Sequence, residues 1–152
     1  MTWLLRKVMP TLKLATFCEK VIVDVNGVPS AIGLFSQLNV AVPPATIFPE
    51  NAIAPKEWAM LFIWECTLEE VGREFSQLFK ATTADGKSFG AQSTIKFTPQ
   101  RDRLRQNVVA NSQAVPIGRA GKVTITTHLE LDEQIVVSPM EFGFDVVLVK
   151  AV

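Results

Sequence analysis

The 152-residue sequence has no tyrosine, one histidine and two cysteines, and these shortages restrict its chemistry. Nucleophilic catalysis needs a Ser or Cys beside a base, and a metal site needs several converging His, Cys or carboxylate ligands. Neither Cys18 nor Cys66 falls in a nucleophile motif, and no phosphate loop, dinucleotide fingerprint or zinc-protease helix occurs. We therefore interpret the cysteines as structural and His128 as a solvated residue on a strand. We expect no catalytic residue, no metal and no cofactor.

The sequence also lacks an excess of charge of either sign, because 15 Lys and Arg residues balance 15 Asp and Glu residues. Non-specific nucleic-acid binding depends on neutralising phosphates, so a net charge of zero argues against it. Zero net charge also removes one protection against association, since mutual repulsion helps to keep proteins monomeric. The charge balance therefore favours a protein partner, or a second copy of the chain, over nucleic acid.

Long apolar runs are absent as well. The longest, from Trp58 to Trp64, is far shorter than the roughly 20 residues that span a bilayer. The first ten residues place their charges after the apolar residues, whereas a secretory signal has the reverse order. We expect a cytoplasmic protein without membrane contact and with reduced thiols, the alternative being a single bridge between Cys18 and Cys66.

The composition is that of one globular domain, with 48% hydrophobic and 20% charged residues. No internal repeat, low-complexity tract or linker divides the chain. Pro10 ends the first segment, so we predict an N-terminal tail over residues 1–12 and a single domain over residues 13–152.

Alternation of apolar and polar residues at period two predicts strands along most of the chain. The clearest alternation runs from Val123 to Leu131, and Asn26-Gly27 and Asp85-Gly86 supply hairpin turns. About eight short strands with little helix predict an all-β fold, an antiparallel Ig-like β-sandwich. The expected strands cover residues 13–25, 31–38, 58–66, 73–82, 89–98, 108–115, 123–131, 135–137 and 142–149, the last two separated by Pro139.

Three segments depart from simple alternation. Residues 58–66 are apolar on both faces, which predicts a central strand or a strand whose outer face meets a partner. Residues 40–57 contain four prolines and predict a long edge or loop crossing. Residues 67–81 favour a turn followed by a strand from Arg73, with a short helix after a Thr67–Glu70 capping box as the alternative. Gly33 marks a bulge or a close backbone approach.

Three short motifs occur early in the chain: a first strand ending near Cys-Glu, a glycine turn and a Ser-x-Ile-Gly-x-Phe strand. They are Ala15 to Glu19, Asn26-Gly27 and Ser30 to Phe35. In these motifs the chain resembles a family of small bacterial domains of unknown function. The resemblance covers most of residues 13–150 and implies a single β-sandwich domain from a bacterium or its phage. It carries over no catalytic residue. Further matches are Glu70-Val71-Gly72, Asp85-Gly86 and Gly121-Lys122-Val123; the departures are the Trp-bearing tail and Pro43-Pro44.

Two charged clusters are candidates for partner contact. Arg101, Arg103 and Arg105 are spaced by two, so an extended chain would project them the same way, and arginine suits carboxylates or phosphates. The second cluster is acidic and consists of Glu65, Glu69, Glu70 and Glu74. Because the two clusters have opposite charge on a neutral molecule, they predict head-to-tail docking of two copies. The alternative is that both clusters are solvated loops.

Ten phenylalanines and three tryptophans without tyrosine indicate core packing or an apolar subunit interface. Trp58 and Trp64 are therefore either core residues or interface hot spots. We predict a non-enzymatic protein-interaction or self-assembly module that uses these tryptophans and the two charged clusters. The alternative is a small-anion or ligand-binding domain that uses the three arginines.

Overall fold

The computed structural model of the chain describes residues 9–150. This part of the chain contains nine strands and one short 3-10 turn, so the all-β fold is confirmed. The predicted tail over residues 1–12 lies mostly outside the described residues, and the first strand begins at Thr11. The elements are β1 (Thr11–Val23), β2 (Pro29–Leu34), β3 (Gln37–Val42), β4 (Ile53–Glu65), η1 (Leu68–Glu70), β5 (Phe75–Thr82), β6 (Ser93–Phe97), β7 (Arg105–Pro116), β8 (Gly121–Leu131) and β9 (Gln134–Lys150).

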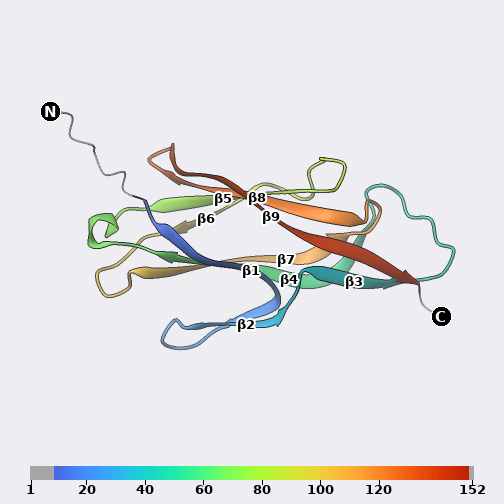
Figure 1. Ribbon diagram of the computed structural model, residues 1–152, viewed down its shortest axis with the longest axis horizontal. Helices are drawn as coiled ribbons and strands as arrows, with labels where there is room; N and C mark the ends of the chain where they lie inside the picture. The colour runs from blue at the N-terminus through green and yellow to red at the C-terminus, as the bar shows by residue number, and fades with distance from the viewer. Residues whose placement is uncertain (1–8, 151–152) are drawn as a thin grey trace.

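The strands form two sheets that enclose one apolar core (Figure 1). A four-stranded sheet has the order β2-β1-β4-β7, and a five-stranded sheet has the order β3-β9-β8-β5-β6. The predicted alternation of β8 is confirmed, because Val123, Ile125, Thr127 and Leu129 are buried between the sheets. Every phenylalanine except Phe89 belongs to the core or packs against it, and a ring without a hydroxyl suits this dry interior.

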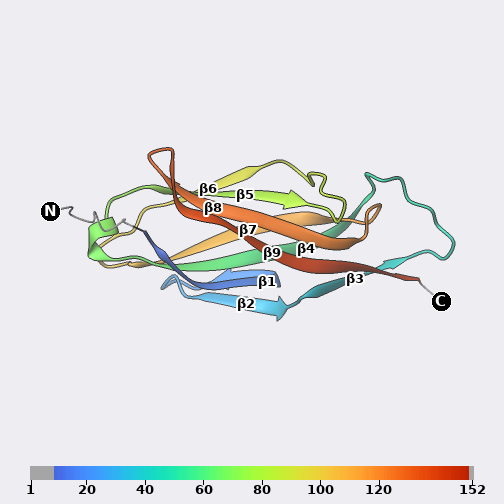
Figure 2. The same cartoon turned by 45° about the horizontal axis from the view of Figure 1, so that its top comes forward.

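The hairpin of β1 and β2 turns back over the outer face of the four-stranded sheet. The first half of β1 pairs with β4 as far as Cys18, and its second half pairs with β2 alone. At the hairpin tip, Nδ2 of Asn107 donates a hydrogen bond to the carbonyl oxygen of Gly27 at 2.8 Å. Asn107 pairs with Ile63 of β4, so the tip lies near the end of β4 from which β1 started. Figure 2 shows this ribbon beneath β4 and β7.

Gly33 lies where the hairpin bends. Its φ of +71° favours glycine, and a Cβ there would lie 2.8 Å from Cγ of Glu19 on the neighbouring strand. Gly33 therefore has a close neighbour, as predicted, but the neighbour is the Glu19 side chain and not backbone. A larger residue at this position would have to displace Glu19 before β2 could stay paired with β1.

The hairpin explains why β4 is apolar on both faces. Met60, Phe62 and Trp64 point into the core, whereas Ala59 and Leu61 point the other way and are still only 1% and 2% exposed. β4 lies between β1 and β7, so the prediction of a central strand is confirmed. The outer face of β4 is covered by the chain's own hairpin. No partner is therefore needed to explain its apolar outer side chains.

The predicted strand over residues 31–38 is wrong in its extent, because the chain changes sheets there. β2 ends at Leu34 in one sheet and β3 begins at Gln37 in the other. Between them, Phe35 enters the core, with its ring centroid 6.0 Å from that of Phe17. Arriving from the opposite sheet, β3 runs parallel to β9, whereas the other strand pairs among the described residues are antiparallel. A wholly antiparallel arrangement is therefore also wrong.

We predicted that Pro139 separates two strands, and this prediction is wrong. Pro139 lies inside β9. Thr127 pairs with Met140 and Leu129 pairs with Val137, so two residues of β9 stand opposite His128. This is a β-bulge, and a bulge accommodates a proline because the local ladder is already interrupted. Residues 135–149 therefore form one long strand.

Two ambiguous segments are resolved. At residues 67–81 the favoured turn and strand are confirmed, although the strand begins at Phe75 and not at Arg73. The capping box of the alternative also forms, around the single 3-10 turn η1, where Oε2 of Glu70 accepts a hydrogen bond from the Thr67 amide at 2.7 Å. The strand predicted over residues 89–98 is shorter, because β6 covers only Ser93–Phe97. Phe89 instead donates its amide to the Ala81 carbonyl at 2.8 Å as part of a loop.

Candidate functional site

Both cysteines are buried free thiols without nucleophilic character. Burial, helped by the nearby Glu70 carboxylate, raises the pKa of the Cys66 thiol to about 12. Burial also raises the pKa of Cys18, whose Sγ donates to the Ala59 carbonyl oxygen at 3.8 Å. Because the thiolate is the reactive form, neither residue is activated at neutral pH.

His128 lies on the outward-facing side of β8, as its alternation predicts. Its Nε2 is 3.2 Å from Oε1 of Glu130, two residues away on the same strand. Among residues 9–150, no hydrogen bond joins the imidazole to Cys18 or Cys66. The same residues contain no group of three or more His, Cys, Asp and Glu side chains arranged to hold a metal ion.

The three arginines do not form the extended stripe that their spacing suggested. Arg101 and Asp102 form a tight turn, in which the Arg103 amide donates to the Gln100 carbonyl at 2.9 Å. Arg103 and Arg105 line a groove that Arg101 does not reach. The turn replaces an extended chain because its ends pair with each other as an isolated bridge.

This hairpin groove lies between the tip of the β1–β2 hairpin and the start of β7. It encloses about 580 Å³ and is lined by Gly27, Ile63, Asn107 and the two arginines, among others. The Arg103 guanidinium lies against Gly27, where a Cβ would be 3.7 Å from its Cζ. Within the described chain, no carboxylate lies within 4.0 Å of that guanidinium, whereas Arg105 is 3.7 Å from Glu65.

The four glutamates differ in their contacts and burial. Glu65 contacts Lys13 at 3.8 Å as well as Arg105, and Glu74 contacts Lys96 at 3.5 Å. Glu70 is buried and occupied by the Thr67 amide. Of the four glutamates, only Glu69 in η1 is exposed and has no ion pair with another residue of the range 9–150.

The two tryptophans predicted as core residues or contact residues lie in the core. Nε1 of Trp64 donates to Oε1 of Gln77 at 3.0 Å, and Nε1 of Trp58 donates to the Ala114 carbonyl at 2.9 Å. Both side chains are buried. Trp64 is 0% exposed and Trp58 is 6% exposed, so neither indole stands out from the surface as a contact residue.

The sequence analysis missed an apolar surface on the hairpin. No charged residue occurs from Val25 to Pro49, and this uncharged segment forms β2 and β3, each at an edge of its sheet. Ile22, Ile32 and Leu34 share one side of the ribbon and are 45%, 47% and 67% exposed. We call these three residues the hairpin face. The missing Lys, Arg, Asp and Glu over residues 25–49 were the signal that could have revealed it.

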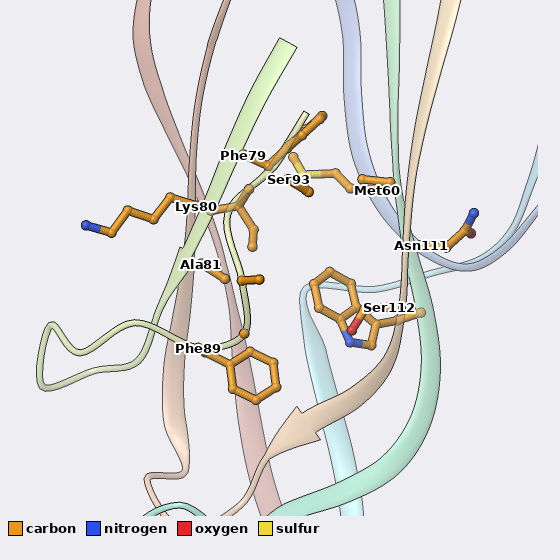
Figure 3. Close-up of a pocket in the computed structure, with 13 residues that line it drawn as sticks. Met60, Phe79, Lys80, Ala81, Phe89, Ser93, Asn111 and Ser112 are labelled. Carbon is orange, nitrogen blue, oxygen red and sulfur yellow. The ribbon is translucent and has the colours of Figure 1, made fainter. Parts of the chain in front are cut away.

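A second missed feature is a pocket of about 270 Å³ between the two sheets (Figure 3). We call it the inter-sheet pocket. Figure 3 shows Ala81 and Phe89 on one side of the pocket and Ser112 of β7 on the other. Its large lining residues are Trp58, Met60, Phe79, Phe89 and Ile125, and its small ones are Ala81, Ala91, Ser93, Ala110 and Ser112.

The fold defines the chain as an all-β domain of two facing sheets. Residues 13–140 match the model of a family of unknown function (DUF6941), so the protein belongs to this family. No curated protein matches the sequence. Across residues 9–150, there is no helix with the length and hydrophobicity needed to cross a membrane.

Among solved structures, the chain is similar to the Pseudomonas fluorescens alkylpurine DNA glycosylase AlkC bound to DNA containing an abasic site analog. The match has a TM-score of 0.40 and 8% identity, and it covers 88% of this chain and 30% of the glycosylase chain. A similarity at this level supports no argument about activity, substrate or partner.

Proposed function

We propose that the protein is a non-enzymatic interaction module whose partner is a second copy of itself, bound through the hairpin face. The observation that carries this proposal is the uncharged segment at the sheet edges. Edge strands present unpaired N–H and C=O groups, and proteins usually guard them with charged side chains. β2 contains no charged residue. The nearest charged side chain on its face is Lys20 of β1, which pairs with Ile32.

A second copy fits this surface better than a charged partner does. A two-fold interface places the same patch on both subunits, so a mainly apolar patch with Lys20 as its one charge can be complementary to itself. Single exposed apolar residues are ordinary, but a contiguous patch on an unguarded edge is typical of a contact site. The net charge of zero adds no long-range repulsion between two copies.

Sedimentation velocity between about 1 and 500 µM tests the proposal, a range that covers weak dimers. We expect wild type to dimerise and Leu34→Lys to remain monomeric, because the substitution places a charge within the buried contact. Leu68→Lys is the matched control, since Leu68 is 60% exposed but belongs to η1 and not to the hairpin face. A wild type that stays monomeric at every concentration contradicts the proposal.

A second candidate function is the binding of a small anion in the hairpin groove. Arg103 supports it, because its guanidinium has no carboxylate partner among residues 9–150 and faces a groove of about 580 Å³. A thermal-shift screen with phosphate, nucleotides and dicarboxylates provides the test. Stabilisation of wild type that disappears in Arg103→Gln supports this function, and no stabilisation by any anion removes it.

We further propose that the two sheets serve as they do in Ig-like domains, as a rigid support for a contact surface. The continuous aromatic core supports this use. The bacterial origin and the cytoplasmic location expected from the sequence stay predictions, and fractionation of cells that produce the protein tests the second.

A further inference from the structure

Small side chains collect at one end of an otherwise aromatic core. Ala81 on β5 and Ala110 and Ser112 on β7 line the inter-sheet pocket from opposite sheets. Large aliphatic residues at these positions would fill it, as Phe and Trp residues fill the rest of the interior. Apolar walls that touch neither protein nor ligand lose dispersion contacts, so an unfilled pocket is unfavourable.

The pocket opens because β6 covers only half of β5. β6 pairs with Phe75–Phe79, and beyond Phe79 the edge of β5 is followed only by the loop that leads to β6. That loop is attached to β5 by the bond from the Phe89 amide to the Ala81 carbonyl at 2.8 Å. Gly90, at a φ of +73°, follows Phe89 directly. A ligand can therefore enter beside Phe89 without separating the sheets.

The polar groups of the pocket restrict the ligand to a neutral molecule. The indole N–H of Trp58 is already donated to Ala114. The Ser112 hydroxyl donates to the same carbonyl at 3.1 Å, and its oxygen accepts a long hydrogen bond from the Ala114 amide at 3.5 Å. A hydroxyl oxygen has two lone pairs, so one remains for a hydrogen bond from a ligand. The one charged lining residue is Lys80, whose ammonium points away from the pocket in Figure 3. No cationic group of the lining faces the pocket, so a buried carboxylate or phosphate would have no opposite charge to pair with.

We propose that the inter-sheet pocket binds a small neutral aromatic compound of one or two rings that donates a hydrogen bond to Ser112 Oγ. The volume of about 270 Å³ is close to the lower end of ligand pockets, roughly 300 Å³, and exceeds the roughly 150 Å³ of a cavity that binds benzene. Phe79, Phe89 and Trp58 supply ring contacts. This inference does not depend on the hairpin face or on dimerisation.

Isothermal titration calorimetry with 2-naphthol tests the proposal, and 2-naphthoate is the matched charged ligand. We expect 2-naphthol to bind and 2-naphthoate to bind at least about tenfold more weakly. Ala110→Leu fills the pocket and should weaken 2-naphthol by at least about tenfold. Ala120→Leu, at an exposed alanine of the loop before β8, should leave binding unchanged. Ile32→Lys should also bind normally, which separates this site from the hairpin face.

Ser112→Ala keeps the test decisive if Ala110→Leu does not fold. This variant should weaken 2-naphthol but not naphthalene, because only 2-naphthol has a hydroxyl to donate. Three results overturn the proposal: no binding of 2-naphthol by wild type, equal binding of 2-naphthoate, or equal affinity of a folded Ala110→Leu variant for 2-naphthol.

Discussion

A buried polar chain joins the two sheets, and Gln77 is its centre. The Gln77 side chain is fully buried on β5. It accepts a hydrogen bond from Trp64 Nε1 at 3.0 Å and donates one to Thr127 Oγ1 at 3.0 Å. Replacing Gln77 with leucine conserves the approximate size of the side chain but removes both bonds at once.

The expected loss is large because two groups in a dry core lose their partners. Each unsatisfied buried donor or acceptor costs about 1–3 kcal/mol, and the added apolar burial of leucine offsets part of this. We therefore expect Gln77→Leu to lower the free energy of unfolding by about 2–4 kcal/mol. Since domains are usually stable by about 5–15 kcal/mol, this is a substantial fraction of the total.

Urea unfolding at pH 7, followed by tryptophan fluorescence, measures the effect. Gln113→Leu is the matched control, because Gln113 is an exposed glutamine on β7, and it should change stability by no more than about 0.5 kcal/mol. The double variant with Thr127→Val should cost less than the sum of the single variants, because the same hydrogen bond is removed in both. A Gln77→Leu variant as stable as the control refutes the reasoning.

Three further predictions follow from single residues. Gly118→Ala should destabilise the fold by about 2 kcal/mol or more in the same urea assay, because the new Cβ would lie 1.9 Å from the Pro49 carbonyl oxygen; an unchanged midpoint would show that the loops separate freely. Cys66, with a pKa of about 12, should resist iodoacetamide at pH 8 until the chain unfolds; rapid labelling of the native protein argues against the buried thiol. The hydrogen bond from the Thr83 hydroxyl lowers the pKa of Asp85 below 3.8, so the stabilisation from Asp85 is present above pH 3.8 and is lost as the pH falls through the folded pKa. The free energies of unfolding of wild type and Asp85→Asn should therefore converge in acid. A constant difference down to low pH contradicts the shift.

Strand positions were predictable from the sequence wherever one face of the strand is buried. β8 alternates at period two because its inward side chains meet the core and its outward ones meet solvent. The turn between β1 and β2 follows from Asn26-Gly27, in which Gly27 adopts a φ of +76°. These signals are local, and local signals also located β4 as a doubly buried strand.

The path of the hairpin was not predictable, because alternation does not say which surface a strand covers. β1 leaves β4 after Cys18, and the long-range hydrogen bond from Asn107 to Gly27 shows that the hairpin then turns back toward β4 and β7. The inter-sheet pocket was hidden for a similar reason. Ala81 and Ala110 are far apart in sequence, and their small size matters only because they line one space.

Amide hydrogen exchange of the hairpin at about 5 and 500 µM tests the central claim most directly, since exchange reports local protection residue by residue. If two copies bind through Ile22, Ile32 and Leu34, amides of residues 22–34 exchange more slowly at the higher concentration while those of β8 do not change. Identical hairpin exchange at both concentrations would contradict the account.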